Sequence, residues 1–421
     1  MRPAFRYVAT ALALAVSLVL AMTTGSGLAA AQDSGQTQGA GQGAGRGTWQ
    51  AAGQAAGQAA RWPGKGGGTQ VVPQLVAHFG HQVTGVAVSE RGRVFVNFPR
   101  WTEDAPVSVA EVTPDGGLRP YPDAGWNAWR NVRRDELDPA SHWVCVQSVV
   151  ADGRGSLWVV DPAAPGLDGI VRGGPKLVRI DLATDRVAQV IRFGEDVAIP
   201  GSYLNDVRFS ADGRHAFLTD SGQRGALVVV ELASGTARRV LDGHPSTQPE
   251  PGVVVRTDGR PLRYPDGRPV LFAADSIALS QDGYLYWKPL TGTTLYRIAA
   301  GVLATRGLAG QDVADAVQPY GRVGPTDGFW IARGTDTLFI TAIEDNAVKA
   351  RDLGQGPGGG LRVVAQDPRL RWPDTFSQGP DGALYVTTSR IQDSAFFRRD
   401  APLALPTQLW KLAPPLPGTP H

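Results

Sequence analysis

The sequence is poor in the residues that hold small or metal-bound folds together. It has 1 Cys and 2 Met among 421 residues. A single cysteine excludes an intramolecular disulfide and every Cys-rich zinc or iron–sulfur site. A chain of this length buries about three quarters of its unfolded surface and needs no such cross-link. We therefore expect Cys145 to be a free, buried thiol.

Charge is scarce and nearly balanced. Only 19% of the residues are charged, with 41 Lys and Arg against 39 Asp and Glu. Arg2 and Arg6 lie in a leader-like N-terminus, and without these two the chain has 39 basic and 39 acidic side chains. A neutral chain argues against nucleic acid or an anionic membrane as the main partner.

The long apolar run at the N-terminus, residues 8–22, follows two arginines and precedes the small residues Ala29, Ala30 and Ala31. This order predicts a secretory signal peptide over residues 1–31, cleaved near Ala31. The run is nearer 15 than 20 residues long, too short for a transmembrane anchor. We expect a secreted protein, extracellular or periplasmic, with no stable membrane anchor.

Residues 32–70 are Gly, Gln and Ala with almost no large apolar side chains. Such a composition buries too little surface to offset the entropy lost on ordering. We expect a disordered linker here and a folded domain over residues 71–415.

The folded region repeats one pattern six times. A turn containing Gly leads into a short strand rich in β-branched and aromatic residues. Successive aromatic positions are separated by 63, 59, 69, 53 and 46 residues, a spacing typical of repeated blades. The six aromatic positions are Phe95, Trp158, Phe217, Tyr286, Phe339 and Tyr385.

One further strand precedes each aromatic strand, and another follows it, with Gly and Asp turns between them. Six such units of antiparallel strands predict an all-β fold, a six-bladed β-propeller. The strand at 73–79 has no partner nearby and is expected to close the last blade. Longer inserts are expected to cap one face; they lie at 97–106, 123–143, 161–174, 243–272 and 390–405.

The strands that precede the aromatic positions all have a polar second residue. In a propeller these inner strands line the axis, so the six side chains are expected to converge there. Buried carboxylates near one another repel and are poorly solvated unless a cation or hydrogen bonds compensate. The ring therefore predicts a ligand-binding site or a cation site. Its members are Thr84, Gln147, Asn205, Asp275, Asp327 and Asp374.

A cation at this ring would have oxygen ligands from Asn205, Asp275 and Asp327. Such a set favours Ca or another oxygen-preferring divalent ion over Zn or Cu. The next residue along one inner strand, Asp206, either joins this site or bonds between blades. An aromatic insert with Trp126, Trp129 and Trp143 either roofs the channel or packs in the core. Zincin, nucleophile-elbow and P-loop motifs do not occur.

Several strings resemble the major royal jelly protein/Yellow family across residues 75–413. They include VQSVVADGRGSLWVVD, YLNDVRFSADGRHAFLTDSGQRGALVVVEL, ADSIALSQDGYLYWKPLTGTTLYRI and DPRLRWPDTFSQGPDGALYVTTS. The resemblance implies a secreted six-bladed propeller. Animal members of the family include dopachrome-conversion proteins and binders of biogenic amines, and bacterial relatives are often labelled dopachrome-tautomerase-related.

The inner strands are more distantly similar to the regucalcin/gluconolactonase propellers. Their divalent metal is held by one Glu, two Asn and one Asp. Asn205 falls on one family Asn, Asp275 on the other and Asp327 on the family Asp. Thr84 stands in place of the Glu, which departs from the metal-binding pattern.

Three functions remain open at this stage. The first is binding of a small aromatic, amine or catechol-like ligand, extended to tautomerase-like proton transfer with Asp327 and Asp374 as the catalytic acids. The second is a metal-dependent lactonase, in which a divalent ion polarises the ester carbonyl. The third is a propeller that binds partners without catalysis.

Overall fold

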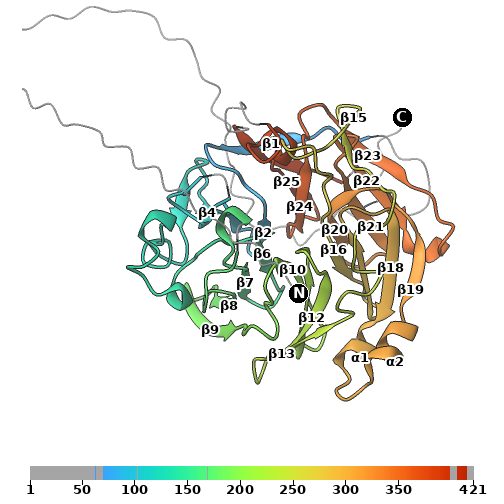
Figure 1. The fold of residues 1–421 in the computed structure, drawn as a ribbon. Coiled ribbons are helices and arrows are strands. Elements are labelled where there is room, and N and C mark those ends of the chain that lie inside the picture. Colours follow the sequence, from blue (N-terminus) through green and yellow to red (C-terminus); the bar gives the residue numbers. More distant parts are fainter. Residues whose placement is uncertain (1–61, 63–69, 102, 168, 399–404, 415–421) are drawn as a thin grey trace, which may run out of the picture. The chain divides into compact units, whose positions relative to one another are not determined.

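Six four-stranded antiparallel sheets surround a common axis in the computed structural model (Figure 1). The structure describes residues 62, 70–101, 103–167, 169–398 and 405–414, which all belong to one unit, Ala52–His421. The predicted signal peptide, 1–31, lies outside the described residues. So does the predicted linker, 32–70, except for Trp62 and Gln70.

The strand nearest the axis in each blade has the polar ring residue at its second position or just before its start. The inner strands are β2 (Val86–Val88), β6 (Ser148–Ala151), β10 (Leu204–Phe209), β16 (Ala274–Leu279), β20 (Thr326–Ile331) and β24 (Pro373–Gln378). The second strands carry the aromatic positions. They are β3 (Val94–Asn97), β7 (Ser156–Asp161), β11 (His215–Asp220), β17 (Tyr284–Pro289), β21 (Thr337–Ala342) and β25 (Leu384–Thr388).

The two remaining strands of each blade lie farther from the axis. The third strands are β4 (Val109–Val112), β8 (Lys176–Asp181), β12 (Ala226–Glu231), β18 (Thr294–Ala299), β22 (Ala347–Asp352) and β26 (Thr407–Leu412). The outer strands are β5 (Leu118–Pro120), β9 (Arg186–Arg192), β13 (Thr236–Val240), β19 (Gln318–Arg322), β23 (Arg362–Gln366) and β1 (Gln74–Phe79).

The ring closes as the sequence predicts. The N-terminal strand β1 pairs antiparallel with β26 and completes the sixth blade, in the order β1–β26–β25–β24. Each inner strand packs beside the next, and β24 packs beside β2. The predicted six-bladed propeller is therefore confirmed, including its closing strand.

Helices are few and short. The described residues contain α1 (Ala300–Ala304) and α2 (Gly310–Asp315) between β18 and β19, and a small hairpin of β14 (Arg256–Thr257) and β15 (Arg260–Pro261) in the 243–272 insert. None of the described helices has the length and apolar character needed to cross a bilayer.

The apolar core lies between successive blades. One cluster joins Val160 and Leu177 of the second blade to Leu218 and Val228 of the third. Strands β7 and β21 are buried along their whole length, because a neighbouring blade covers each face.

Trp62 also belongs to this core, although it falls in the segment predicted to be a disordered linker. Its ring packs edge-on against Phe339 at 4.9 Å between ring centroids. Its Nε1 donates a hydrogen bond to the Gly382 carbonyl at 3.0 Å. This residue therefore ties the start of the folded unit to the fifth and sixth blades.

Candidate functional site

A cavity of about 620 Å³ opens at the end of the propeller where the inner strands begin. Four of the six predicted ring residues line it: Gln147, Asn205, Asp275 and Asp327. All four side chains are buried, between 5% and 7% exposed. The sequence prediction of a polar site on the axis thus agrees with the position of a real cavity.

Four inner strands are irregular at the point where the ring residues lie. The pairing register shifts between Leu204 and Val207 in β10, and at the corresponding place in β16, β20 and β24. A bulge redirects side chains and interrupts simple alternation. It therefore lets consecutive residues such as Asn205 and Asp206 both lie near the axis.

Thr84 does not line the cavity. Its hydroxyl donates to the Gln147 carbonyl at 2.9 Å and accepts from Asn97 Nδ2 at 2.8 Å. The first contact ties the first blade to the second, and the second lies within the first blade. Thr84 is fully buried, so its predicted place among the ligand-binding residues is not what the geometry supports.

Asp374 is likewise buried away from the lining residues, at 1% exposure. The backbone of its strand runs so close to β20 that a Cβ at Gly328 would lie 2.1 Å from the Asp374 carbonyl oxygen. Its Oδ1 accepts from Thr375 Oγ1 at 3.0 Å, while its Oδ2 has no hydrogen-bond partner. Burial, together with the charge of Asp327, raises the pKa of Asp374 well above its usual range.

One side of the cavity is a chain of neutral hydrogen bonds. The Tyr203 hydroxyl accepts from Trp101 Nε1 at 2.6 Å and donates to Gln147 Oε1 at 2.9 Å. Gln147 Nε2 donates to Asn205 Oδ1 at 3.3 Å, and Asn205 Nδ2 donates to Ser221 Oγ at 3.1 Å. Burial raises the pKa of Tyr203 far above 10, so this wall stays uncharged.

The opposite side is an acid pair. The carboxyl groups of Asp275 and Asp327 are hydrogen-bonded to each other, and Trp372 Nε1 donates to Asp327 Oδ2 at 2.6 Å. Burial raises the pKa of Asp327 to about 6, although both hydrogen bonds oppose the rise. Burial, with the charges of Asp327 and Asp374, raises the pKa of Asp275 well above its usual value. Two such groups ionise one after the other, so between their two pKa values the pair holds one proton and one negative charge.

The Trp372 contact gives a direct prediction. A hydrogen bond to a carboxylate stabilises its charged form, so Trp372→Phe is expected to raise the pKa of Asp327 further, by about one unit. Infrared titration of the carboxyl band measures this change. Trp101→Phe is the matched control, since Trp101 lines the same cavity but bonds to Tyr203. An unchanged Asp327 pKa in Trp372→Phe would contradict the assigned role of the indole.

Two buried basic side chains accompany the acids, and neither was predicted from the sequence. Lys288, on β17, is fully buried and donates to the carbonyls of Pro289 and Leu290 at 2.6 and 3.3 Å. Burial lowers its pKa to about 7, against the pull of Asp275 and Asp327. Deeper on the axis, Arg208 forms an ion pair with Asp206 at 2.8 Å.

Asp206 thus resolves the alternative left by the sequence. Its Oδ1 accepts from the Ser148 hydroxyl of the neighbouring blade at 2.8 Å, and its Oδ2 faces Arg208. It joins two blades and neutralises a buried arginine. It is not among the residues that line the cavity.

The roof of the cavity comes from the long inserts and is strongly aromatic. Four of the five predicted capping inserts contribute lining residues. Arg371 holds two of them together, with Nη1 to Asp258 Oδ1 at 2.9 Å and Nε to Asp393 Oδ2 at 2.7 Å. The aromatic lining residues are Trp101, Tyr203, Tyr264, Phe272, Trp372 and Phe396.

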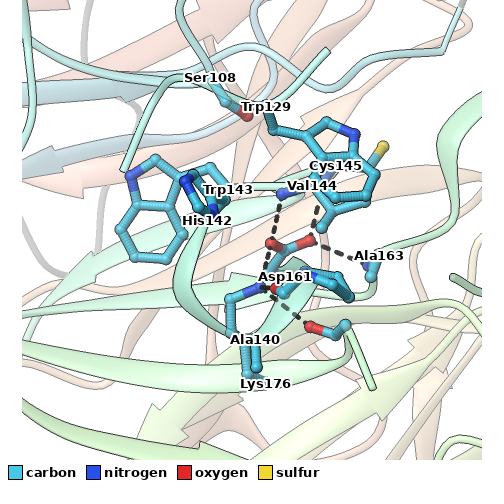
Figure 2. Close-up of polar contacts among 12 residues, drawn as sticks. Ser108, Trp129, Ala140, His142, Trp143, Val144, Cys145, Asp161, Ala163 and Lys176 are labelled. Atoms are coloured by element: carbon cyan, nitrogen blue, oxygen red, sulfur yellow. Dashed lines mark hydrogen bonds and ion pairs between the residues drawn. The ribbon is translucent and has the colours of Figure 1, made fainter. Parts of the chain in front are cut away.

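The tryptophans of the 123–143 insert pack in the core instead of roofing the cavity. Trp129 and Trp143 are fully buried. Figure 2 shows both beside Asp161, a carboxylate at the end of β7 that accepts from the backbone N–H of Val144 and Cys145 at 2.8 and 3.0 Å. Cys145 is free and buried, as expected.

Asp161 also forms a fully buried ion pair with Lys176, at 2.8 Å (Figure 2). Because Val144 and Cys145 lie three and two residues before Gln147, this cluster fixes the point at which the second inner strand enters the site. Asp220 does the same in the third blade, where it accepts from Tyr203 N–H at 2.8 Å and pairs with Arg239. Both carboxylates follow their aromatic position by three residues, a repeat that is visible in the sequence.

The predicted metal ligands Asn205, Asp275 and Asp327 line the same cavity, and their metal-binding role stays a prediction. No group of three or more His, Cys, Asp or Glu is placed to hold an ion among the described residues. Asn205 Oδ1 already accepts a hydrogen bond, and Asp275 and Asp327 are bonded to each other. This donor set fits a proton-sharing acid pair better than a divalent cation.

The fold and the cavity together define a six-bladed propeller with an acidic, aromatic site on its axis. The family model described as "Major royal jelly protein" matches residues 144–396, which is more than half of the chain. The chain belongs to this family, and the resemblance seen in the sequence is confirmed.

Solved structures with similar folds come from several sources. A PQQ-bound aldose sugar dehydrogenase from Streptomyces coelicolor is 12% identical, with a TM-score of 0.49, and the match covers 84% of this chain and 99% of that one. A gluconolactonase from Xanthomonas campestris is 14% identical, with a TM-score of 0.48 and coverage of 83% and 99%. A virginiamycin B lyase from Staphylococcus aureus is 14% identical, with a TM-score of 0.42 and coverage of 76% and 82%. No curated protein matches the sequence.

Proposed function

We propose that the axial cavity binds a small aromatic amine or catechol and transfers a proton on a catechol-derived substrate. The observation that carries this proposal is the acid pair Asp275–Asp327 at the wall of a cavity whose other buried lining side chains are uncharged and in part aromatic. A buried carboxylate pair with one negative charge is matched by an ammonium group or by the paired hydroxyls of a catechol.

The aromatic roof supports the same class of ligand. Flat rings stack on Trp and Tyr side chains, and a cation gains further from their π faces. A cavity of about 620 Å³ is within the usual size for a small-molecule site. The acid pair lies on one side of the cavity, so it would orient the ligand as well as hold it.

The proton transfer follows from the two different carboxyl groups. In its ionised form Asp327 accepts a proton from a substrate carbon, and Asp275, in its protonated form, gives its proton to the quinone oxygen. The substrate gains an O–H bond and loses a C–H bond, so no oxidant is consumed. This assignment moves the second acid from Asp374, predicted from the sequence, to Asp275, because only Asp275 lines the cavity.

Calorimetric titration tests the binding step. Benzylamine is expected to bind saturably at one site, about ten-fold more tightly than benzyl alcohol, because only the amine forms a charge-assisted hydrogen bond. Dopachrome turnover, followed by loss of its colour, tests the chemical step. Equal binding of the two ring compounds, or binding of neither, would contradict the proposal.

The lactonase alternative rests on Asn205, Asp275 and Asp327 facing one cavity. Metal analysis of the purified protein, with chelation during a lactone assay, separates it from the amine proposal. Bound calcium and a chelator-sensitive lactonase activity would favour it. If no small molecule binds saturably to the propeller, the third alternative, a protein that binds partners without catalysis, would be favoured. We also propose that the leader-like N-terminus directs the protein out of the cytoplasm.

A further inference from the structure

The charged residues that line the cavity are separated by depth. Asp275 and Asp327 are its acidic residues, and both are buried. Arg268 is its one basic lining residue among the described residues, and its side chain is 74% exposed. The acidic lining residues are therefore buried, and the basic one lies where the cavity opens to solvent.

Arg268 is held at the opening by a tight turn. The backbone N–H of Tyr264 donates to the Arg268 carbonyl at 3.0 Å, and Gly267, at φ 87°, donates to the Tyr264 carbonyl at 2.8 Å. The positive φ of Gly267 is a conformation that a side chain would strain. The turn thus fixes the backbone of Arg268 relative to the roof.

Two contacts fix its side chain. Arg268 Nε donates to Asp266 Oδ2 at 2.6 Å, and the guanidinium lies over the Tyr264 ring, 5.4 Å from its centroid. The terminal nitrogens Nη1 and Nη2 form no hydrogen bond with any described residue, and they are the donors that bind a carboxylate in bidentate fashion. The pair with Asp266 is exposed, and such pairs contribute little and exchange readily.

We propose that Arg268 recognises an acidic group on the ligand, so that the preferred ligand is an aromatic molecule with an amine at one end and a carboxylate at the other. The ammonium lies at Asp275 and Asp327, the ring lies under the aromatic roof, and the carboxylate lies at Arg268. This inference rests on the proposed function and adds the far end of the ligand to it.

Three ligands that share the benzylamine core test the inference: benzylamine, para-aminomethylbenzoate and its neutral amide, para-aminomethylbenzamide. The wild type is expected to bind the benzoate about ten-fold more tightly than the benzamide. Added salt should reduce this preference, because the Arg268 contact is exposed. Calorimetry gives the three dissociation constants, and para-aminomethylphenylpropanoate extends the series to a longer ligand.

Two variants are expected to change the preference for the benzoate in opposite directions. Arg268→Gln should abolish the preference for the benzoate while binding benzylamine at least as tightly, since a positive charge is removed. Asp266→Asn should increase the preference, because it removes the competing carboxylate. Thermal unfolding of each variant shows that the exposed turn has not altered the fold.

The outcomes separate the two proposals. If benzylamine binds and the benzoate has no advantage over the benzamide, the role of Arg268 is wrong and the amine site stands. An advantage that survives Arg268→Gln also overturns it. If no member of the series binds, the proposed function itself fails.

Discussion

Asp161→Ala is expected to lower the free energy of unfolding by about 3–5 kcal/mol, the cost of removing one partner of a buried ion pair. Asp161 and Lys176 are both fully buried, and burial already lowers the pKa of the lysine. The substitution leaves this cation with two backbone carbonyls, from Pro139 and Gly174, as its remaining hydrogen-bond partners. It also strands three backbone N–H groups that bond to the carboxylate. Chemical denaturation measures the loss.

Two controls isolate the buried charge. Glu195→Ala breaks the ion pair with Arg172. Because the side chains of Arg172 and Glu195 are 95% and 80% exposed, this change should alter the free energy of unfolding by less than about 1 kcal/mol. Asp161→Ala combined with Lys176→Met removes both charges and should recover part of the loss. If the single variant were as stable as the wild type, the pair would not hold the entry to the second blade.

The blade architecture could be read from the sequence because each repeat specifies its own hairpins. The spacing of Phe95, Trp158 and their equivalents predicts six units. The strand at 73–79, which has no partner nearby in the sequence, can then pair only with the last blade. Local turn chemistry and alternation determine such features. Trp62 was missed because a single tryptophan in a Gly-rich segment carries no pattern. Its partners Phe339 and Gly382 are also distant in the sequence.

The site could be predicted only in part, for a physical reason. Alignment places six polar residues at the axis, but it does not show which neighbour each side chain will find. Thr84 meets the Gln147 carbonyl, and Asp374 is kept from the cavity lining, whereas Asp275 and Asp327 reach it. Bulges and contacts between blades decide this, and neither follows from spacing.

The missed residues share another property. Trp372 and Lys288 are residue types that do not recur at the equivalent positions of the other blades, and Arg268 lies in an insert, so repetition does not mark them. Trp372 and Lys288 interact with the acid pair, and Arg268 lines the cavity, only because the fold brings them there. A repeated fold thus reveals its scaffold by repetition, while its chemistry depends on departures from that repetition.

Asp327→Asn is expected to lower the rate of dopachrome isomerisation by about 100-fold or more. The same change is expected to lower the affinity for benzylamine by about ten-fold. A positioned general base contributes about 10²–10⁴-fold to a proton transfer. Asparagine keeps the shape and an acceptor oxygen for Trp372, and it removes the charge. In the wild type, turnover should rise with pH through about 6, the pKa of Asp327, because the ionised form is the base.

Stability provides a separate reading of the same group. The folded-state pKa of Asp327 is raised from 3.8 to about 6, so folding favours the protonated form. Its contribution therefore falls as pH rises from about 4 to about 6, by about 2–3 kcal/mol, and stays lost above that range. Asp327→Asn should remove this loss and be at least as stable as the wild type at pH 8. Asp374→Asn is the control, because Asp374 is also buried but does not line the cavity, and the affinity of this variant for benzylamine should stay within about three-fold of the wild type. A pH profile of binding unchanged by Asp327→Asn, or a larger effect at Asp374, would place the functional carboxylate elsewhere.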